Sequence, residues 1–342
     1  MYCMRKNLQI FLVLVLLFFI RCNNESDIPT IIEPEDLGTL IAADEVPDGE
    51  LASTFVIEWV AGSEAILSGD KGLFALNVAS GSFRMLDEGP KYRFEQTSDG
   101  QYIYFFNSSV VFGEKETLYR IKLDGSEKEV IVDAAYINAD IVVSTDNHQL
   151  AYNRSETGIY LRDLETGNDT LIRSEGAAIR FSEDGAKLLV ATNSFYDDMA
   201  ILDLNTGDEE LIGFPRQSHL MWNEEGLFSP EILNDDDGVH IFIHNLILKT
   251  SNQLYAKALD PNTNIPLATF PTDLSRAAYW TNRIGPVEAA LYSVDLANGD
   301  EVRAVFTTKT QFLGPLVYAP DNSTLIYILH TSEGASIYKR EL

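Results

Sequence analysis

The stretch that decides the fold runs from residue 178 to residue 212 and contains four short apolar segments: Ala178-Ile-Arg-Phe-Ser-Glu-Asp-Gly185, Lys187-Leu-Leu-Val-Ala-Thr192, Ala200-Ile-Leu-Asp-Leu-Asn-Thr-Gly207 and Glu209-Glu-Leu-Ile212. Each segment is rich in Val, Ile, Leu and Phe, and Asp-Gly or Thr-Gly turns separate them. Apolar runs of this length between Gly and Asp turns are typical of β-strands joined by hairpins. The stretch therefore predicts a unit of four antiparallel strands.

This unit recurs along most of the chain. The turn after the first strand recurs at Ser98-Asp99-Gly100, Thr145-Asp146-Asn147, Glu224-Glu225-Gly226, Thr272-Asp273 and Pro320-Asp321-Asn322. Gly or Asn suits such turns because tight hairpins need a positive φ. The third strand recurs from Leu73, Leu118, Ile159, Leu291 and Ile337. The copies follow each other at roughly 41 to 50 residues, the spacing of four-stranded propeller blades. We expect an all-β fold, a single β-propeller of about seven four-stranded blades, with six or eight as alternatives.

Two copies of the repeat also resemble a known family. Phe181-Ser-Glu-Asp-Gly-Ala-Lys-Leu188 and Tyr318-Ala-Pro-Asp-Asn-Ser-Thr-Leu325 are similar to the repeat of WD40-like, TolB-like propellers. The resemblance covers nearly all of residues 54–342. It implies the fold but not one activity, because such relatives include scaffolds, sensor domains, lyases and peptidase-linked domains.

The last copy ends at the C-terminus on its third strand, so its outer strand is missing. The segment Thr39-Leu-Ile-Ala-Ala43 is apolar enough to supply it. An unpaired edge invites aggregation, which favours closure of the ring by this N-terminal strand. The alternative is that the segment is only part of a tether.

The N-terminus resembles a bacterial lipoprotein signal. Arg5 and Lys6 precede an apolar run of about 13 residues, shorter than the ~20 of a membrane-spanning helix, and Cys22 follows it directly. Acidic residues just after the cysteine, here Glu25 to Asp27, are similar to the export signal of Bacteroidota-type surface lipoproteins. Arg21 departs from the lipoprotein pattern, which has a small residue directly before the cysteine. The alternatives are an ordinary signal peptide or an uncleaved anchor.

Together these patterns predict three segments: a signal peptide at 1–21, an acidic tether at 22–50 and the propeller at 51–342. The resemblance implies lipidation of Cys22 and a place in the cell envelope as an outer-membrane lipoprotein, facing the periplasm or the cell surface.

Only Cys3 and Cys22 are present, so the body of the chain has no internal disulfide. The formal net charge of −27 excludes nucleic acid as a partner.

Candidate ligand-binding residues lie where second strands end and in the loops that follow. Amides, aromatic rings and arginines in such loops suit recognition of a glycan or a protein. The candidates are Asn107, Asn153, Arg154, Asn193, Phe195, Tyr196, Asn282, Arg283 and His330. The alternative for the asparagines is that they end strands and open turns. The alternative for the aromatic rings is packing of loop against loop.

No set of residues in the sequence forms a catalytic or metal-binding motif. His240 and His244 would lie ~13 Å apart along a strand, too far to share a metal ion. Residues 234–238 carry three aspartates, but Leu233 and His244 occupy ligand positions of the calcium loop they resemble. We therefore expect no metal or cofactor and favour a non-enzymatic envelope protein that recognises a protein or glycan. The alternatives are a propeller enzyme acting on polysaccharide, as a lyase or hydrolase, and a structural envelope component without a pocket.

Overall fold

The computed structural model describes most of the repeat region and one segment before it. The described residues are 37–43, 54–59, 64–91, 93–106, 116–135, 141–154, 158–192, 198–213, 220–223, 226–235, 238–259, 263–271, 273–283, 288–307, 312–331 and 334–342. Contacts divide the chain into Met1–Pro34 and Glu35–Leu342, and all described residues belong to the second unit.

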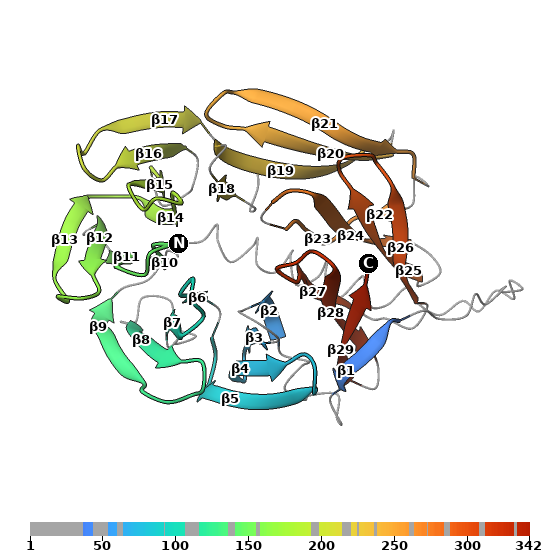
Figure 1. The fold of residues 1–342 in the computed structure, drawn as a ribbon, viewed down its shortest axis with the longest axis horizontal. Helices are drawn as coiled ribbons and strands as arrows, with labels where there is room; N and C mark the ends of the chain where they lie inside the picture. Colours follow the sequence, from blue (N-terminus) through green and yellow to red (C-terminus); the bar gives the residue numbers. More distant parts are fainter. Residues whose placement is uncertain are drawn as a thin grey trace, which may run out of the picture. The chain divides into compact units, whose positions relative to one another are not determined.

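This unit is a β-propeller of seven sheets, arranged around a centre in Figure 1. We number the blades I to VII in chain order. Blades I to IV consist of β2 (Thr54–Trp59), β3 (Glu64–Gly69), β4 (Gly72–Asn77) and β5 (Ser82–Glu88); β6 (Phe94–Gln96), β7 (Tyr102–Phe106), β8 (Glu116–Lys122) and β9 (Glu129–Ala135); β10 (Val142–Val143), β11 (Gln149–Arg154), β12 (Gly158–Asp163) and β13 (Asp169–Arg173); and β14 (Ala177–Phe181), β15 (Lys187–Ala191), β16 (Met199–Asp203) and β17 (Glu209–Gly213).

The remaining blades follow the same order with two variations. They consist of β18 (Met221–Asn223), β19 (Gly226–Asp235), β20 (Gly238–Asn245) and β21 (Thr250–Lys257); β22 (Thr263–Asn264), β23 (Ala268–Thr269), β24 (Arg276–Arg283), β25 (Glu288–Asp295) and β26 (Glu301–Thr307); and β27 (Phe312–Tyr318), β28 (Thr324–Thr331), β29 (Gly334–Glu341) and β1 (Thr39–Ala43). In blade VI two short strands, β22 and β23, both pair with β24. In blade VII the outer strand comes from the N-terminal side of the chain.

In blades II, III, IV and VII the turn after the first strand has the predicted Gly or Asn with a positive φ, whereas in blade VI Leu274 has a positive φ in this turn, +54°. In blade IV the Ser182 hydroxyl donates to Asp184 Oδ1 at 2.6 Å, and the Gly185 amide donates to the Ser182 carbonyl at 2.9 Å. Gly185 has φ +68°, and Asn147 and Asn322 occupy the same turn position with φ +60° and +58°. Asn tolerates the left-handed region better than other side chains, which explains why it replaces Gly there.

The N-terminal strand β1 closes the ring, which confirms the predicted closing strand. It pairs antiparallel with β29, from Thr39 opposite Lys339 to Ala43 opposite Ser336. The Tyr327 hydroxyl in β28 donates to the Leu37 carbonyl just before β1. Ile41 packs into the apolar cluster between blades VII and I, so the strand contributes to the core as well as to the sheet.

The core lies between blades. Each main cluster combines strands of two neighbouring sheets, as where Val56 and Leu73 of blade I pack against Phe94 and Phe105 of blade II. Sheets that bury both faces against neighbours need apolar side chains on both faces of each strand. This explains the nearly unbroken apolar runs of the second strands, such as β7.

The two ends of the ring differ. Successive connections of an antiparallel meander alternate between its ends, so the turns after first and third strands share one end, here called the turn end. The loops after second strands and the connections between blades share the other, the loop end. At the turn end, turns of neighbouring blades interlock: Ser98 of blade II donates through its hydroxyl to the Thr145 carbonyl of blade III at 2.6 Å, and Asn322 of blade VII donates to Asp273 of blade VI at 2.7 Å.

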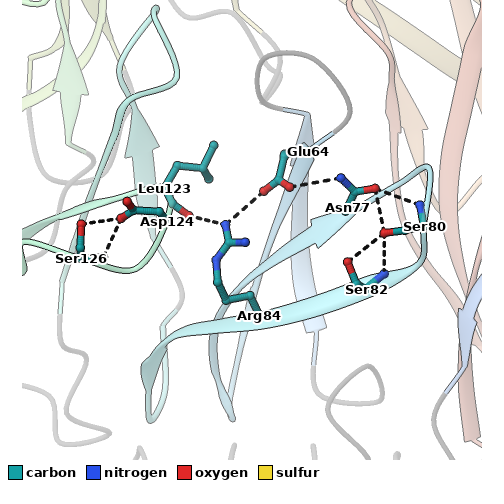
Figure 2. Close-up of polar contacts among 8 residues, drawn as sticks. All are labelled: Glu64, Asn77, Ser80, Ser82, Arg84, Leu123, Asp124 and Ser126. Carbon is teal, nitrogen blue, oxygen red and sulfur yellow. Dashed lines mark hydrogen bonds and ion pairs between the residues drawn. The ribbon is translucent and has the colours of Figure 1, made fainter.

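Figure 2 shows a further link at the turn end, between blades I and II. The Arg84 guanidinium donates to the Leu123 carbonyl of blade II at 2.6 Å and lies 3.3 Å from Glu64 Oε2 of its own blade. Asn77 donates to Glu64 Oε1 and accepts from the Ser80 amide of the adjoining turn. This end of the ring is thus made of short turns connected by side-chain hydrogen bonds.

Candidate functional site

Part of the predicted ligand-binding set can be located at the loop end. Asn107, Asn193, Phe195, Tyr196 and the predicted lipidation site Cys22 lie outside the described residues. Arg283 has a described backbone in β24, without a described side chain. Asn153, Arg154, Asn282 and His330 belong to the second strands of blades III, VI and VII. Ligand contact by all of these residues stays a prediction.

Asn153 joins two blades. Its side chain is 8% exposed; its Nδ2 donates to the Gly176 carbonyl, and its Oδ1 accepts from the Ala178 amide at 3.1 Å. Gly176 and Ala178 belong to the start of blade IV. Asn234, at the corresponding strand end in blade V, donates to the Thr263 carbonyl of blade VI at 3.0 Å. At these two positions the amide holds one blade to the next.

The other described members have different surroundings. Arg154 lies 3.4 Å from Asp169 and places its guanidinium 4.7 Å from the centre of the Tyr160 ring. Asn282 is half-buried, and its Oδ1 is buried with no hydrogen-bond donor among the described residues. His330 is half-buried and lies opposite Phe312 in the β27–β28 pair. Since these side chains come from three blades, a shared ligand would have to reach across the ring.

A set of ionisable side chains that the sequence analysis did not single out lies on the inner strands. Glu58, Glu95 and Arg180 each pair with the third residue of the second strand in their blades, namely with Ile66, Tyr104 and Leu189. They therefore occupy the same register position in blades I, II and IV, near the turn end of the inner strand. The sequence signal that could have found these three residues is an ionisable side chain inside a short, mostly apolar strand.

The inner strands border the central channel of the propeller. Arg180 is exposed, whereas Glu58 and Glu95 are half-buried. Burial raises the pKa of the Glu58 carboxyl to about 7, and the positive charge of Arg180 acts in the opposite direction. Blades I and IV are not neighbours, so this interaction acts across the centre of the ring. A carboxyl group with a pKa near neutrality is characteristic of functional sites as well as of structural ion pairs.

Gln96 lies beside this set. Its Nε2 donates to the Trp59 carbonyl at 3.0 Å, which connects the inner strand of blade II to that of blade I. Its Oε1 is buried and has no hydrogen-bond donor among the described residues. A buried carbonyl oxygen without a donor costs about 1–3 kcal/mol of stability.

Two further charged side chains, Lys91 and Glu301, each have several hydrogen-bond or ion-pair partners within the protein. Lys91 is fully buried; its ammonium donates to the Glu88 and Gly89 carbonyls at 2.7 and 3.0 Å and lies 3.1 Å from Asp87, and burial lowers its pKa. Glu301 in blade VI accepts from Tyr279 at 2.7 Å and also from Tyr255 and Lys257 of blade V. Burial alone would raise the pKa of Glu301, but these donors hold it below its usual value.

The described residues contain neither a cluster of metal ligands nor a membrane-crossing helix. No group of three or more His, Cys, Asp or Glu side chains is placed to hold a metal ion among them. Within the same residues, no helix has the length and apolar character needed to cross a bilayer.

Comparisons with known proteins show the fold. No protein-family model matches the sequence, and no curated protein matches it. An oligogalacturonate lyase in complex with manganese is similar in structure, with 15% identity, a TM-score of 0.58, and coverage of 82% of this chain and 86% of that one. The oligogalacturonate lyase of Vibrio parahaemolyticus shows 12% identity, a TM-score of 0.59, and coverage of 90% and 91%.

A prolyl endopeptidase structure also resembles this chain, with 12% identity and a TM-score of 0.57; the match covers 88% of this chain and 50% of that one. TolB from Acinetobacter baumannii is similar at 15% identity and a TM-score of 0.45. At such identities the likeness shows the propeller fold alone. The seven sheets of the structure itself confirm the predicted all-β propeller of about seven blades.

Proposed function

We propose that this protein is a non-enzymatic β-propeller of the cell envelope, attached to the membrane through a lipid on Cys22, that recognises a protein or a glycan at its loop end. The observation that carries the proposal is the contrast between a rigid ring and unequal connections at one end. Strand β7 ends at Phe106 and β8 begins at Glu116, whereas β28 ends at Thr331 and β29 begins at Gly334. Rigid scaffolds that present loops of different length are typical of recognition proteins.

The contacts at the loop end support this role. Asn153 and Asn234 fix the starts of the following blades, and Arg173 donates to the Glu175 and Thr192 carbonyls at 2.6 and 3.1 Å. These bonds hold the strand ends from which the loops leave. The loop after β15 carries Phe195 and Tyr196, which the proposal assigns to ligand contact.

Binding to envelope extracts and to a glycan array tests the recognition role. The variant Phe195→Ala/Tyr196→Ala should lose most of the binding, because aromatic anchors dominate such interfaces. Ser126→Ala, which alters a turn-end hydroxyl, is the matched control and should bind as the wild type does. Equal binding by both variants would contradict a loop-end site.

The lipid anchor is tested separately by cell fractionation. Cys22→Ala should release an intact, soluble propeller, because the acceptor of the lipid is lost. If the exported variant stays in the membrane fraction, the anchor is not on Cys22. Loss of the anchor leaves the ligand-binding result unaffected, so the two parts of the proposal fail independently.

A second candidate function, an enzyme acting on polysaccharide, is favoured by Glu58. A carboxyl with a pKa of about 7 can give or take a proton near neutral pH. Two similar structures are oligogalacturonate lyases. Incubation with oligogalacturonate, followed by the ultraviolet absorbance of unsaturated products, tests it. Product formation that Glu58→Gln abolishes would replace the recognition proposal.

A further inference from the structure

The turn between the third strand and the outer strand of blade V differs in composition from its counterparts. It runs from Asn245 to Thr250 with the sequence Asn-Leu-Ile-Leu-Lys-Thr, and its tip residues are Ile247 and Leu248. The matching turns of blades I, III, IV and VI have small or polar tips, namely Ala79-Ser80, Glu165-Thr166, Asn205-Thr206 and Ala297-Asn298. Blade V therefore has two large aliphatic side chains where the repeat has small or polar ones.

The geometry of the turn does not explain this composition. In blade V the Leu248 amide donates to Asn245 Oδ1 at 2.9 Å. In blade IV the Thr206 amide donates in the same way to Asp203 Oδ1 at 3.0 Å. Such turns depend on the Asn or Asp that accepts these bonds rather than on the residue at the tip. Because the same turn forms with a threonine at its tip, folding of the turn does not require the leucine.

Both tip side chains of the blade V turn lie in water. Leu248 is 68% exposed and Ile247 is 41% exposed, whereas Leu246 before them packs into the apolar cluster between blades IV and V. Among the described residues, the remaining exposed large apolar side chains lie singly on strands. Adjacent exposed aliphatic side chains at the tip of a turn mark a surface that contacts an apolar partner.

The direction of β1 shows which end of the ring the N-terminal chain enters. The strand begins at Thr39, opposite Lys339 near the end of β29. It then runs toward the loop end and reaches Ala43, opposite Ser336. The chain that leads back to Cys22 therefore joins the propeller at the turn end, the same end as the blade V turn.

The predicted tether limits the distance between this end and a membrane that holds Cys22. Residues 23–36 separate Cys22 from Leu37, and they span at most about 50 Å when fully extended. A short tether keeps the turn end at a high effective concentration beside the bilayer. A weak contact is then sufficient, because each aliphatic side chain that leaves water gains on the order of tenfold in its partition constant.

Charge determines the kind of lipid surface that suits the turn. The formal net charge of −27 opposes approach to an anionic bilayer. The blade V turn itself contains no acidic residue and carries Lys249 after its apolar tip. Lysine beside apolar residues is typical of the boundary between headgroups and acyl chains. A bilayer of zwitterionic phospholipid fits both features.

We propose that Ile247 and Leu248 insert into the surface of a zwitterionic phospholipid bilayer and hold the turn end of the propeller against it. The contact rests on the lipid anchor proposed above for Cys22. The tether joins blade VII and the apolar turn belongs to blade V, so two separate attachments restrict the orientation of the ring. The loop end, with its candidate binding residues, then faces away from the membrane.

A fluorescent label beside the turn tests the proposal on the processed protein in vesicles of phosphatidylethanolamine and phosphatidylcholine. Thr250→Cys places a thiol next to the turn and leaves both tip residues intact. Removal of the signal and lipidation consume Cys3 and Cys22, so this thiol is the only reactive one. Asp208→Cys, at the corresponding position of blade IV, is the matched control; both native residues are exposed.

A nitroxide-bearing lipid in the vesicles measures how close each label lies to the bilayer. We expect the label at position 250 to be quenched about threefold or more strongly than the label at position 208, because an inserted turn lies at the headgroup boundary. Ile247→Ser/Leu248→Ser in the Thr250→Cys protein should lower the quenching to the level of the control. Replacing part of the lipid with phosphatidylglycerol should also lower it, since the protein is strongly acidic.

Vesicle flotation and circular dichroism accompany each measurement and establish that the variants are membrane-attached and folded. A folded protein that floats with the vesicles but shows equal quenching at both positions overturns the membrane contact and leaves the anchor intact. A protein that does not float contradicts the anchor and the contact together. Light scattering that shows a dimer, converted to a monomer by Ile247→Ser/Leu248→Ser, would assign the turn to a second copy of the chain and overturn the proposal.

Discussion

The turn end and the loop end of this propeller use the same kinds of residue for different purposes. At the turn end, Ser, Asp and Asn side chains repeat from blade to blade and bond within or between short turns, as Ser98 does with Thr145. At the loop end, Asn153 and Asn234 bond to the backbone of the next blade, and the connections vary in length. A regular end stabilises the ring, and an irregular end is free to acquire binding residues. Substitutions at matched positions can separate these two roles.

The largest expected effect is at a loop-end glycine. Gly158 begins β12 with φ +102°, and a Cβ there would lie 1.9 Å from the Arg173 carbonyl oxygen. Gly158→Ala should lower the free energy of unfolding by about 3 kcal/mol or more. The backbone at Arg173 must move to make room for the Cβ, and alanine is strained at this positive φ. At the turn end, Gly207 has φ +79° and nothing within 4 Å of such a Cβ.

Gly207→Ala is therefore the matched control, with an expected loss of about 1 kcal/mol from the positive φ alone. Urea unfolding of both variants measures the difference. Equal losses would show that close approach of the backbone at the loop end is not a constraint on the fold.

The next effect concerns the bonds between blades. Asn153→Ala removes two hydrogen bonds and leaves the buried Ala178 amide without that acceptor, for an expected cost of about 2–3 kcal/mol. Ser98→Ala removes the exposed bonds of the Ser98 hydroxyl to the Thr145 carbonyl and to Asn147 Oδ1 and should cost about 1 kcal/mol or less. Urea midpoints compare the two. A larger loss for the serine variant would mean that the turn end, not the loop end, depends on its side-chain bonds.

A smaller effect, visible only at higher pH, is expected in the channel. Burial raises the pKa of Glu58 from 4.5 to about 7, so the folded protein binds its proton more tightly than the unfolded chain does. The resulting stabilisation is complete below about pH 4.5 and is lost as the pH rises through 7. Glu58→Gln should match the wild type at pH 5 and be about 2 kcal/mol more stable at pH 8.

Chemical unfolding of both proteins at the two pH values measures this difference. If the stability difference between Glu58→Gln and the wild type were the same at pH 5 and at pH 8, the pKa of Glu58 would not be raised in the folded protein.

The smallest effect is expected for the link in Figure 2. The Arg84 side chain is 44% exposed, so solvent weakens its interaction with Glu64. Arg84→Gln should change the free energy of unfolding by about 0.5 kcal/mol, measured by thermal unfolding at low and high salt. A loss of several kcal/mol would indicate that the turn end is held together by ion pairs rather than by repeated turns.

Much of the architecture could be predicted because it is local. Gly185, Asn147 and Asn322 mark tight turns by residue type, and the apolar segments between them mark strands. Copies at a constant spacing then predict radial closure. The closing strand followed from the missing outer strand of blade VII, and the pairing of β1 with β29 confirmed it.

The candidate sites were harder to predict. Asn153 has the residue type of a ligand-binding amide, but its bonds to Gly176 and Ala178 depend on how blade IV packs against blade III. Glu58 and Arg180 lie far apart in the sequence, and nothing local pairs them. Register had to be known before their common height along the channel could be recognised.

The sequence by itself determined the strands and the turns, because hairpin geometry depends on neighbouring residues and on the short-range conformational preferences of Gly, Asn and Asp. It also predicted about seven blades and a closing strand, and the sheets of the structure settled both. Only the tertiary structure decided which polar groups share a solvent space and which are consumed in bonds between blades. Closure of the ring brings Arg180 of blade IV near Glu58 of blade I, and burial there sets the protonation of that carboxyl group. Both depend on distances between residues that are remote in the chain, which no local pattern encodes.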